Sequence, residues 1–177
     1  MNESWRKSLD REIPLSFQEW LKYKGSFMQR LLEFGIANAE ITVLDESWQQ
    51  PWDTECHLLK LAEHETALVR EVIIFSRDKR WMFARTVFPR EILKGQYECL
   101  AQLKNRSLGS VLFKDPDMQR SEFEFIAVQP PMQLYTKVTR AAPEIRAASL
   151  LTRRSVFTLH SHSLLLTEVF LPDLALL

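Results

Sequence analysis

Three charged side chains stand in stretches of sequence whose pattern otherwise predicts buried β-strands. Arg70 lies in the run ALVREVIIFS, Arg85 in WMFARTVF and Glu168 in LLLTEVFL. Side chains along a strand alternate between the two faces of a sheet, and each of these charges shares its face with apolar neighbours. Burying an unpaired charge is costly, so the three groups should pair with one another or with a ligand.

Two arginines against one glutamate leave a positive surplus. This surplus would suit a small ligand with a carboxylate, because a guanidinium binds a carboxylate through two parallel hydrogen bonds. A structural ion pair between Glu168 and an arginine, or a solvated sheet face, explains the same pattern. Glu71 follows Arg70 and lies on the opposite face of its strand, so a sheet covered on one face would bury only one of the two.

Other groups of reactive residues give weaker evidence for a functional site. His160 and His162 could approach a metal ion, but no third ligand lies nearby in the sequence, so no metal site is expected. The four glycines cannot form a GxGxxG or P-loop motif, which excludes the usual nucleotide-binding loops.

Hydrophobic spacing along the sequence predicts the helices and strands that must position these charges. Apolar residues recur at helical spacing over 15–34, interrupted by Gly25, where a break into two helices would form a hinge. Residues 91–104 suggest a second helix, whereas 108–113 is too short to assign. β-Branched and aromatic runs predict strands at 41–48, 67–76, 81–88, 123–128, 155–159 and 164–171. We predict an α+β fold: a single antiparallel sheet of about six strands with helices on one side.

Length and composition limit the classes of protein to which this chain could belong. The length of 177 residues fits one domain, 1–177. Equal numbers of basic and acidic residues, 23 each, argue against nucleic acid as a partner. Neither an apolar leader nor a run of about 18 apolar residues is present, so we expect no membrane insertion and a cytoplasmic location. Two cysteines are too few for a disulfide framework.

Several stretches together resemble the chorismate lyase family over residues 13–172. They are Leu68-Val-Arg-Glu-Val72, Ala84-Arg-Thr-Val-Phe-Pro89, Ser107-Leu-Gly109 with Leu112-Phe113, Arg153-Arg-Ser155 and Leu164-Leu-Leu-Thr-Glu-Val-Phe-Leu-Pro172. The resemblance implies an antiparallel sheet with helical flaps over an enclosed ligand site. It also implies conversion of chorismate to 4-hydroxybenzoate and pyruvate, the first committed step of ubiquinone biosynthesis, by a monomer without a cofactor.

The resemblance also assigns residues. The family's ligand-binding arginine falls on Arg70, its acidic residue on Glu168, and two amides of its flaps on Met28 and Leu108. We expect Arg70 to hold carboxylate or to stabilise charge on the departing enolpyruvate oxygen. We expect Glu168 to transfer a proton, with its pKa raised towards neutrality by apolar surroundings.

Two further possibilities stay open at this point. Arg85 and Arg154 are secondary candidates for electrostatic support of the site. The alternative function is a non-catalytic domain of the same fold that binds or senses a small aromatic acid, since a related fold occurs in effector-binding domains of bacterial transcription regulators.

Overall fold

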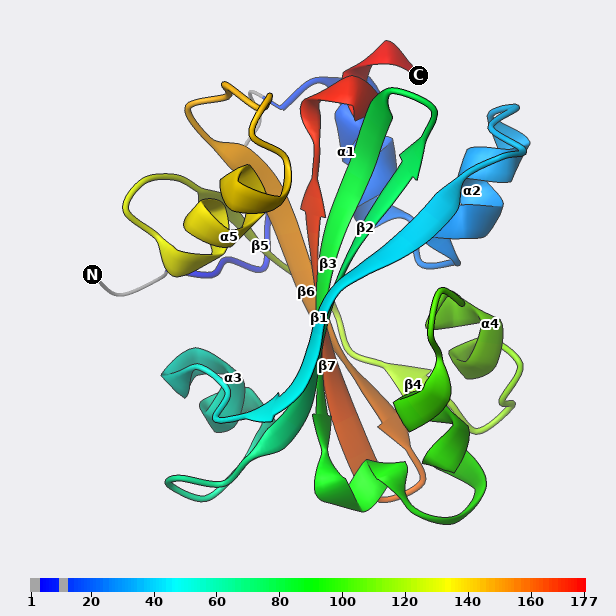
Figure 1. The fold of residues 1–177 in the computed structure, drawn as a ribbon, viewed down its shortest axis with the longest axis vertical. Helices are drawn as coiled ribbons and strands as arrows, with labels where there is room; N and C mark the ends of the chain where they lie inside the picture. Colours follow the sequence, from blue (N-terminus) through cyan, green and yellow to red (C-terminus); the bar gives the residue numbers. More distant parts are fainter. Residues whose placement is uncertain (1–3, 10–12) are drawn as a thin grey trace.

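One antiparallel sheet of seven strands forms the centre of the molecule in the computed structural model, which describes residues 4–9 and 13–177 (Figure 1). Six strands follow the order β1-β2-β3-β7-β6-β4, and β5 also pairs with β6. The strands are β1 (Glu40–Gln49), β2 (Ala67–Ser76), β3 (Lys79–Pro89), β4 (Gln119–Arg120), β5 (Glu124–Val128), β6 (Leu150–Leu159) and β7 (His162–Phe170). The predicted single sheet is therefore confirmed, with one more strand than expected.

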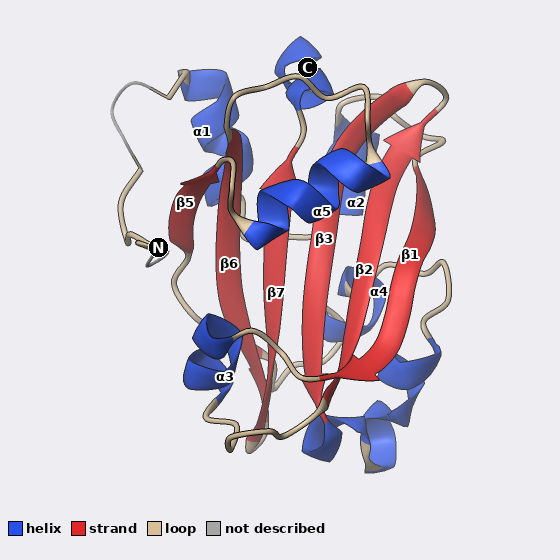
Figure 2. Ribbon diagram, turned by 60° about the vertical axis from the view of Figure 1, so that its left-hand side comes forward, coloured by secondary structure: helices blue, strands red, loops and turns tan. Residues whose placement is uncertain are grey.

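Helices cover both faces of this sheet, so the prediction of helices on one side is wrong. In Figure 2, α3 and α5 lie in front of the sheet, whereas α2 and α4 lie behind it. The helices are α1 (Leu15–Lys22), α2 (Phe27–Glu33), α3 (Asp53–Leu59), α4 (Gly109–Leu112) and α5 (Gln133–Ala141), with 3₁₀ helices η1 (Arg90–Leu93), η2 (Gly95–Gln102) and η3 (Pro172–Leu176). A sheet covered on both faces gives central strands that are buried along their length, as β2 is.

The predicted break at Gly25 is confirmed, because α1 ends at Lys22 and α2 begins at Phe27. The cause is local. Tyr23 adopts an extended backbone, and a Cβ on residue 25 would lie 2.5 Å from the Tyr23 hydroxyl oxygen. Glycine therefore lets the chain turn closely past the tyrosine ring, and Ser26 then begins α2 by accepting a hydrogen bond from the Gln29 amide.

Three other segments differ from the sequence prediction. Residues 91–104 form two 3₁₀ helices rather than one α-helix, because Lys94 is extended and Gly95 has a positive φ of 60°. Strand β6 begins at Leu150, five residues before the predicted start at Ser155, because the polar stretch before Ser155 hides its first half. The helices α3 and α5 were not predicted.

The face behind the sheet carries two separate apolar clusters. The first packs α1 and α2 onto the sheet, with Trp20 and Leu31 at its centre. The second packs η2 and α4 onto the other end of the same face, around Leu100 and Leu112. Because two distinct groups of helices cover one continuous face, a seam lies between them over the middle of the sheet.

Candidate active site

A pocket occupies this seam between α2 and α4. Its lining consists of the loop before α2, the loop before α4 and the inward side chains of the central strands: Gly25, Ser26, Phe27, Met28, Ile41, Arg70, Val72, Ile74, Met82, Ala84, Thr86, Ser107, Leu108, Gly109, Leu112, Phe113, Arg120, Phe157, Leu166 and Glu168. Most of these side chains are apolar, and the charged ones are Arg70, Arg120 and Glu168. Such a pocket suits a compact, mainly apolar ligand that carries negative charge.

Small residues form the floor between Arg70 and Glu168. Strand β3 separates the two charged residues, with Thr86 opposite Arg70 on β2 and Ala84 opposite Glu168 on β7. Two strand spacings across the sheet and an offset of two residues along it put the Cα atoms of Arg70 and Glu168 about 12 Å apart. Ala84 and Thr86 both line the pocket, and their short side chains leave space above the sheet between the two charges.

Arg70 anchors the loop before α4. Its Nη2 donates hydrogen bonds to the carbonyl oxygens of Lys104 and Arg106, at 2.6 and 3.1 Å. Its Nε lies 3.4 Å from a carboxylate oxygen of Glu46, the residue opposite it on β1, and makes no hydrogen bond within the described part of the chain. Burial lowers the pKa of Arg70 despite the opposing effect of Glu46. Arg70 therefore combines a structural role with a buried, incompletely partnered charge at the pocket wall.

Glu168 is held by two arginines. Arg153 lies opposite it on β6 and donates from Nε and Nη2 to its two oxygens, at 2.6 and 2.9 Å. Arg120 donates from Nη2 to Oε2 at 3.1 Å. Burial by itself disfavours the charged carboxylate, but the two guanidiniums outweigh that effect and hold the pKa of Glu168 below its usual range. The expected rise of this pKa towards neutrality is therefore wrong, and Glu168 is ionised at neutral pH.

Arg120 and Arg153 are site residues that the sequence pattern does not indicate. In the sequence Arg153 stands out only as part of the stretch Arg153-Arg-Ser155, yet it is fully buried. The one signal in the sequence is strand alternation: Arg153 falls on the same face as Ser155 and Phe157 when the predicted strand is extended backwards. Arg120 belongs to a strand of two residues, which gives no periodicity to read. Burial and the neighbouring charge of Arg153 lower the pKa of Arg120 to about 10 in spite of Glu168, so the group is still charged at neutral pH.

Met28 and Leu108 each lie close to the start of the helix in one of the two covering segments. Ser26 accepts a hydrogen bond from the Gln29 amide, and Ser107 accepts one from the Ser110 amide. Met28 lies two residues after Ser26, in the first turn of α2, and Leu108 lies one residue after Ser107, at the N-cap of α4. A helix leaves the amides at its start without a partner of its own. Both residues line the pocket.

The two covering segments touch each other across the pocket. A Cβ built on Gly109, the first residue of α4, would lie 3.1 Å from the Ser26 hydroxyl oxygen and 3.0 Å from the Phe113 ring. We call residues 23–33 the first flap and residues 104–113 the second flap. The absence of a side chain at residue 109 lets the two flaps meet.

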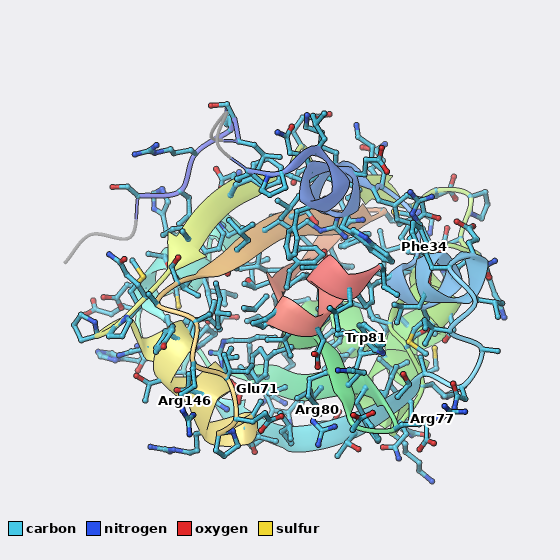
Figure 3. The ribbon with its side chains drawn as sticks, turned by 90° about the horizontal axis from the view of Figure 1, so that it is seen from above. Phe34, Glu71, Arg77, Arg80, Trp81 and Arg146 are labelled. Carbon is cyan, nitrogen blue, oxygen red and sulfur yellow. The ribbon has the colours of Figure 1, made fainter. Side chains whose placement is uncertain are left out.

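Arg85 does not lie in the pocket. It points to the opposite face, where Glu55 of α3 accepts from its Nε and Nη2 at 2.7 and 3.0 Å. Glu71 accepts from its Nη1 at 2.6 Å and also binds Lys137 of α5 at 2.9 Å. Figure 3 shows Glu71 on the side of α5 and Phe34 on the side of α2. Because both faces are covered, Arg70 and Glu71 are buried on opposite sides, and Arg85 joins α3 and α5 to the sheet.

Arg154 also lies outside the pocket lining. Its Nε donates to Glu124 on the neighbouring strand β5 at 2.8 Å, and its guanidinium lies 4.0 Å from the centre of the Trp5 ring. Arg153 and Arg154 are adjacent in β6, so their side chains point to opposite faces.

Two further observations concern metals and membranes. Among the residues that the structure describes, no three His, Cys, Asp or Glu side chains come close enough to hold a metal ion. Over the same residues, none of the helices has the length and apolar character needed to cross a membrane.

Comparison with known proteins agrees with this geometry. Residues 1–175 match the family model described as chorismate lyase. A protein of Nitrosospira multiformis named "Probable chorismate pyruvate-lyase" is 34% identical over 155 residues, covering 88% of this chain and 86% of its own. A protein of the same name from Thiobacillus denitrificans is 36% identical over 163 residues, covering 92% and 86%.

Solved structures show the same fold at much lower identity. The effector domain of PhnF from Mycobacterium smegmatis superposes with a TM-score of 0.61 at 11% identity, over 84% of this chain and 90% of that one. This likeness shows the fold alone. The match along almost the whole chain, together with relatives above 30% identity, establishes that the protein belongs to the chorismate lyase family.

Proposed function

We propose that this protein converts chorismate to 4-hydroxybenzoate and pyruvate in the pocket between the two flaps. The observation that carries this function is the placement of Arg70 and Glu168 at two sides of one apolar pocket, on the strands that flank β3. Membership of the chorismate lyase family supports the same reaction.

The charge of the pocket suits chorismate, which carries a ring carboxylate and an enolpyruvyl carboxylate. The buried Glu168 carboxylate pairs with the buried Arg153 and the partly buried Arg120, and the buried Arg70 adds a third positive charge on the other side of β3. Glu46 offsets part of the charge of Arg70 from the neighbouring strand. At least one positive charge therefore remains for an anionic ligand, and the apolar walls favour a ring over a more hydrated anion.

The reaction breaks two bonds of the substrate. The ether bond from ring carbon C3 to the enolpyruvyl oxygen breaks, and its electron pair leaves with that oxygen. The C4–H bond also breaks, and its electron pair becomes part of the aromatic ring. The released enolpyruvate takes up a proton at its methylene carbon to become pyruvate. Aromatisation drives this step, so the residues present need only orient the substrate and stabilise developing charge.

Each site residue then has a defined task. The amides of Met28 and Leu108 bind the ring carboxylate from the flaps, which places the C3 and C4 end of the ring towards the sheet. Arg70 stabilises negative charge on the departing enolpyruvate oxygen. Glu168 is an ionised acceptor, so it binds the hydroxyl on C4 and can take up a proton from that carbon, but it has none to donate.

The wider setting of the reaction is proposed on the same family relationship. We place the enzyme at the first committed step of ubiquinone biosynthesis, acting as a cytoplasmic monomer without a cofactor. Residues 1–177 would act as a single domain, because one continuous sheet carries all four apolar clusters.

The alternative function is a non-catalytic domain that binds a small aromatic acid. The fold it shares with the effector domain of PhnF favours this reading. The test is to incubate purified protein with chorismate and to record the melting temperature with 4-hydroxybenzoate in parallel. Enzymatic loss of chorismate supports the lyase. A higher melting temperature without any loss of chorismate supports the binding domain and overturns the proposed reaction.

A further inference from the structure

Arg120 connects the pocket carboxylate to the backbone of the first flap. Its Nη2 donates to Glu168 Oε2 at 3.1 Å, while its Nη1 donates to the carbonyl oxygen of Lys24 at 3.0 Å. Its Nε donates to the hydroxyl of Ser155 at 2.9 Å. Lys24 immediately precedes Gly25, where the chain breaks between α1 and α2. A single guanidinium therefore binds both the carboxylate at the floor of the pocket and the turn that carries its cover.

The surroundings of Arg120 fix its orientation. The guanidinium carbon lies 4.4 Å from the centre of the Phe123 ring and 4.6 Å from that of Phe157, and the side chain is 9% exposed. The five donors of a guanidinium lie in one rigid plane. Its Nη2 contact with Glu168 and its Nη1 contact with Lys24 are consequently set together, since the group cannot turn towards one without moving relative to the other.

We propose that Arg120 is a positioning residue that links the charge of Glu168 to closure of the first flap over the pocket. The ionised carboxylate holds the guanidinium in the plane that presents Nη1 to the Lys24 carbonyl. A neutral group at position 168 weakens that hold, and the turn at Gly25 loosens. This inference deepens the proposed function, on which its catalytic meaning rests, but the coupling itself is a property of the protein without substrate.

Arg153 has a different place in the same network. Its Nη1 donates to the carbonyl oxygens of Trp20, Leu21 and Tyr23, which belong to the end of α1 and its cap. It therefore fixes the base of the first flap rather than the turn, and it is absent from the pocket lining as described. Arg120 is the arginine that both lines the pocket and binds the turn.

The chain offers a matched control for this contact. Lys24 also forms an exposed ion pair with Glu122, at 3.2 Å. Glu122→Gln removes an interaction with the same residue of the same turn, but it leaves Arg120 and Glu168 intact. An exposed pair of this kind contributes little to stability.

The experiment measures hydrogen exchange of the hydrogen-bonded amides of the first flap, among them those of Tyr23, Gln29 and Arg30, at neutral pH and without ligand. The proteins are the wild type, Arg120→Lys, Glu168→Gln, their double variant and Glu122→Gln. Lysine keeps the charge but cannot bind both partners in one plane. We expect each of the first two variants to lose protection by about tenfold, the size of one charge-assisted hydrogen bond. The double variant should lose no more than either single one, and Glu122→Gln should stay within about twofold of the wild type.

Two results would overturn the coupling. Wild-type protection in Arg120→Lys would show that the planar group is not needed. Multiplying losses in the double variant would show that Arg120 and Glu168 act on the flap independently, as merely structural contacts do. Exchange in β2 and β3 reports whether each variant is folded. If Glu168→Gln does not fold, Glu168→Asp, which keeps the charge but shortens the reach, replaces it with the same expected loss.

Failure of this inference can be told apart from failure of the proposed function. If the losses of protection are non-additive but chorismate is not turned over, the proposed reaction is contradicted and the coupling is supported. If chorismate is turned over but the losses of protection multiply in the double variant, the proposed reaction is supported and the coupling is contradicted.

Discussion

Glu168 and Arg153 face each other directly across the β6–β7 pair, and two parallel hydrogen bonds of 2.6 and 2.9 Å join them. This pairing determines the chemistry of the pocket carboxylate. A glutamate in apolar surroundings alone would bind its proton more tightly, whereas a glutamate with two guanidiniums stays charged. The site therefore presents a fixed negative charge rather than a group that titrates near neutrality.

The first prediction concerns pH. Because the pKa of Glu168 is lowered in the folded protein, its ionised form stabilises the fold above the unfolded pKa of about 4.3, and that contribution is lost as the pH falls through the lower folded pKa. We expect no fall of kcat/KM between about pH 7 and pH 5 that depends on Glu168. A pH-rate profile checks this expectation, and an acidic limb with an apparent pKa of 6 to 7 that disappears in Glu168→Gln would contradict it.

A second prediction concerns the negative charge of Glu168 itself. Glu168→Gln leaves Arg153 and Arg120 without their anion, so we expect kcat to fall about 100-fold and the melting temperature to drop. Glu124→Gln is the matched control, because Glu124 pairs with Arg154 outside the pocket lining. Steady-state kinetics and thermal unfolding of the two variants give the comparison. A loss of activity in Glu124→Gln as large as in Glu168→Gln would show that the effect is not specific to the pocket.

Arg70 should matter more for turnover than for folding. Arg70→Ala removes the buried charge at the pocket wall together with two hydrogen bonds to the second flap. We expect turnover to fall at least about 1,000-fold and stability by about 2 kcal/mol. Arg106→Ala removes a guanidinium from the same flap, which within the described part of the chain binds only the carbonyls of Gln102 and Leu103, and the variant should retain activity. Unfolding of Arg70→Ala under native conditions would favour the structural ion pair instead.

Arg85 should show the opposite behaviour. Arg85→Met leaves the buried carboxylates of Glu55 and Glu71 without their shared partner. We expect a loss of about 3 to 5 kcal/mol in the free energy of unfolding, with kcat per folded molecule unchanged. Denaturant unfolding and kinetics at low temperature measure the two effects separately. A large fall in kcat with unchanged stability would place Arg85 in the catalytic machinery, against its position on the far face.

The floor of the pocket offers a test of ligand position. Ala84→Val adds two methyl groups beside Glu168, where the ring is proposed to lie, so we expect the KM for chorismate and the Kd for 4-hydroxybenzoate to rise at least about tenfold. Val87→Ile is the control on the opposite face of the same strand, within a separate apolar cluster. It should alter stability but not binding. Unchanged affinity in Ala84→Val would move the ligand away from this floor.

Alternation along strands was enough to identify Arg70 and Glu168 as unusual, because each interrupts an apolar face. It could not choose their partners. The pairing of Arg153 with Glu168 depends on the register of β6 against β7, and the first half of β6 is masked by polar residues. The partner of Arg85 was also hidden, because Glu55 lies on α3, a helix of seven residues.

Two larger features also lay beyond local patterns. Helices α3 and α5 cover the second face of the sheet. Strand alternation alone predicted that only one of Arg70 and Glu71 would be buried, whereas this second cover buries both. Arg120 reaches the pocket from a strand of two residues that pairs with β6. Its role depends on tertiary contacts with Lys24 and Glu168, which are far away in the sequence.

The most direct test of the proposed reaction is the stoichiometry of its products. Purified protein is mixed with chorismate in the presence of a metal chelator and without added cofactor, and 4-hydroxybenzoate and pyruvate are quantified together, with Arg70→Ala in parallel. We predict equal amounts of the two products, formed well above the spontaneous rate by the wild type and near that rate by Arg70→Ala. Formation of neither product above the spontaneous rate, or equal rates in both proteins, would contradict the assignment of this pocket as a chorismate lyase site.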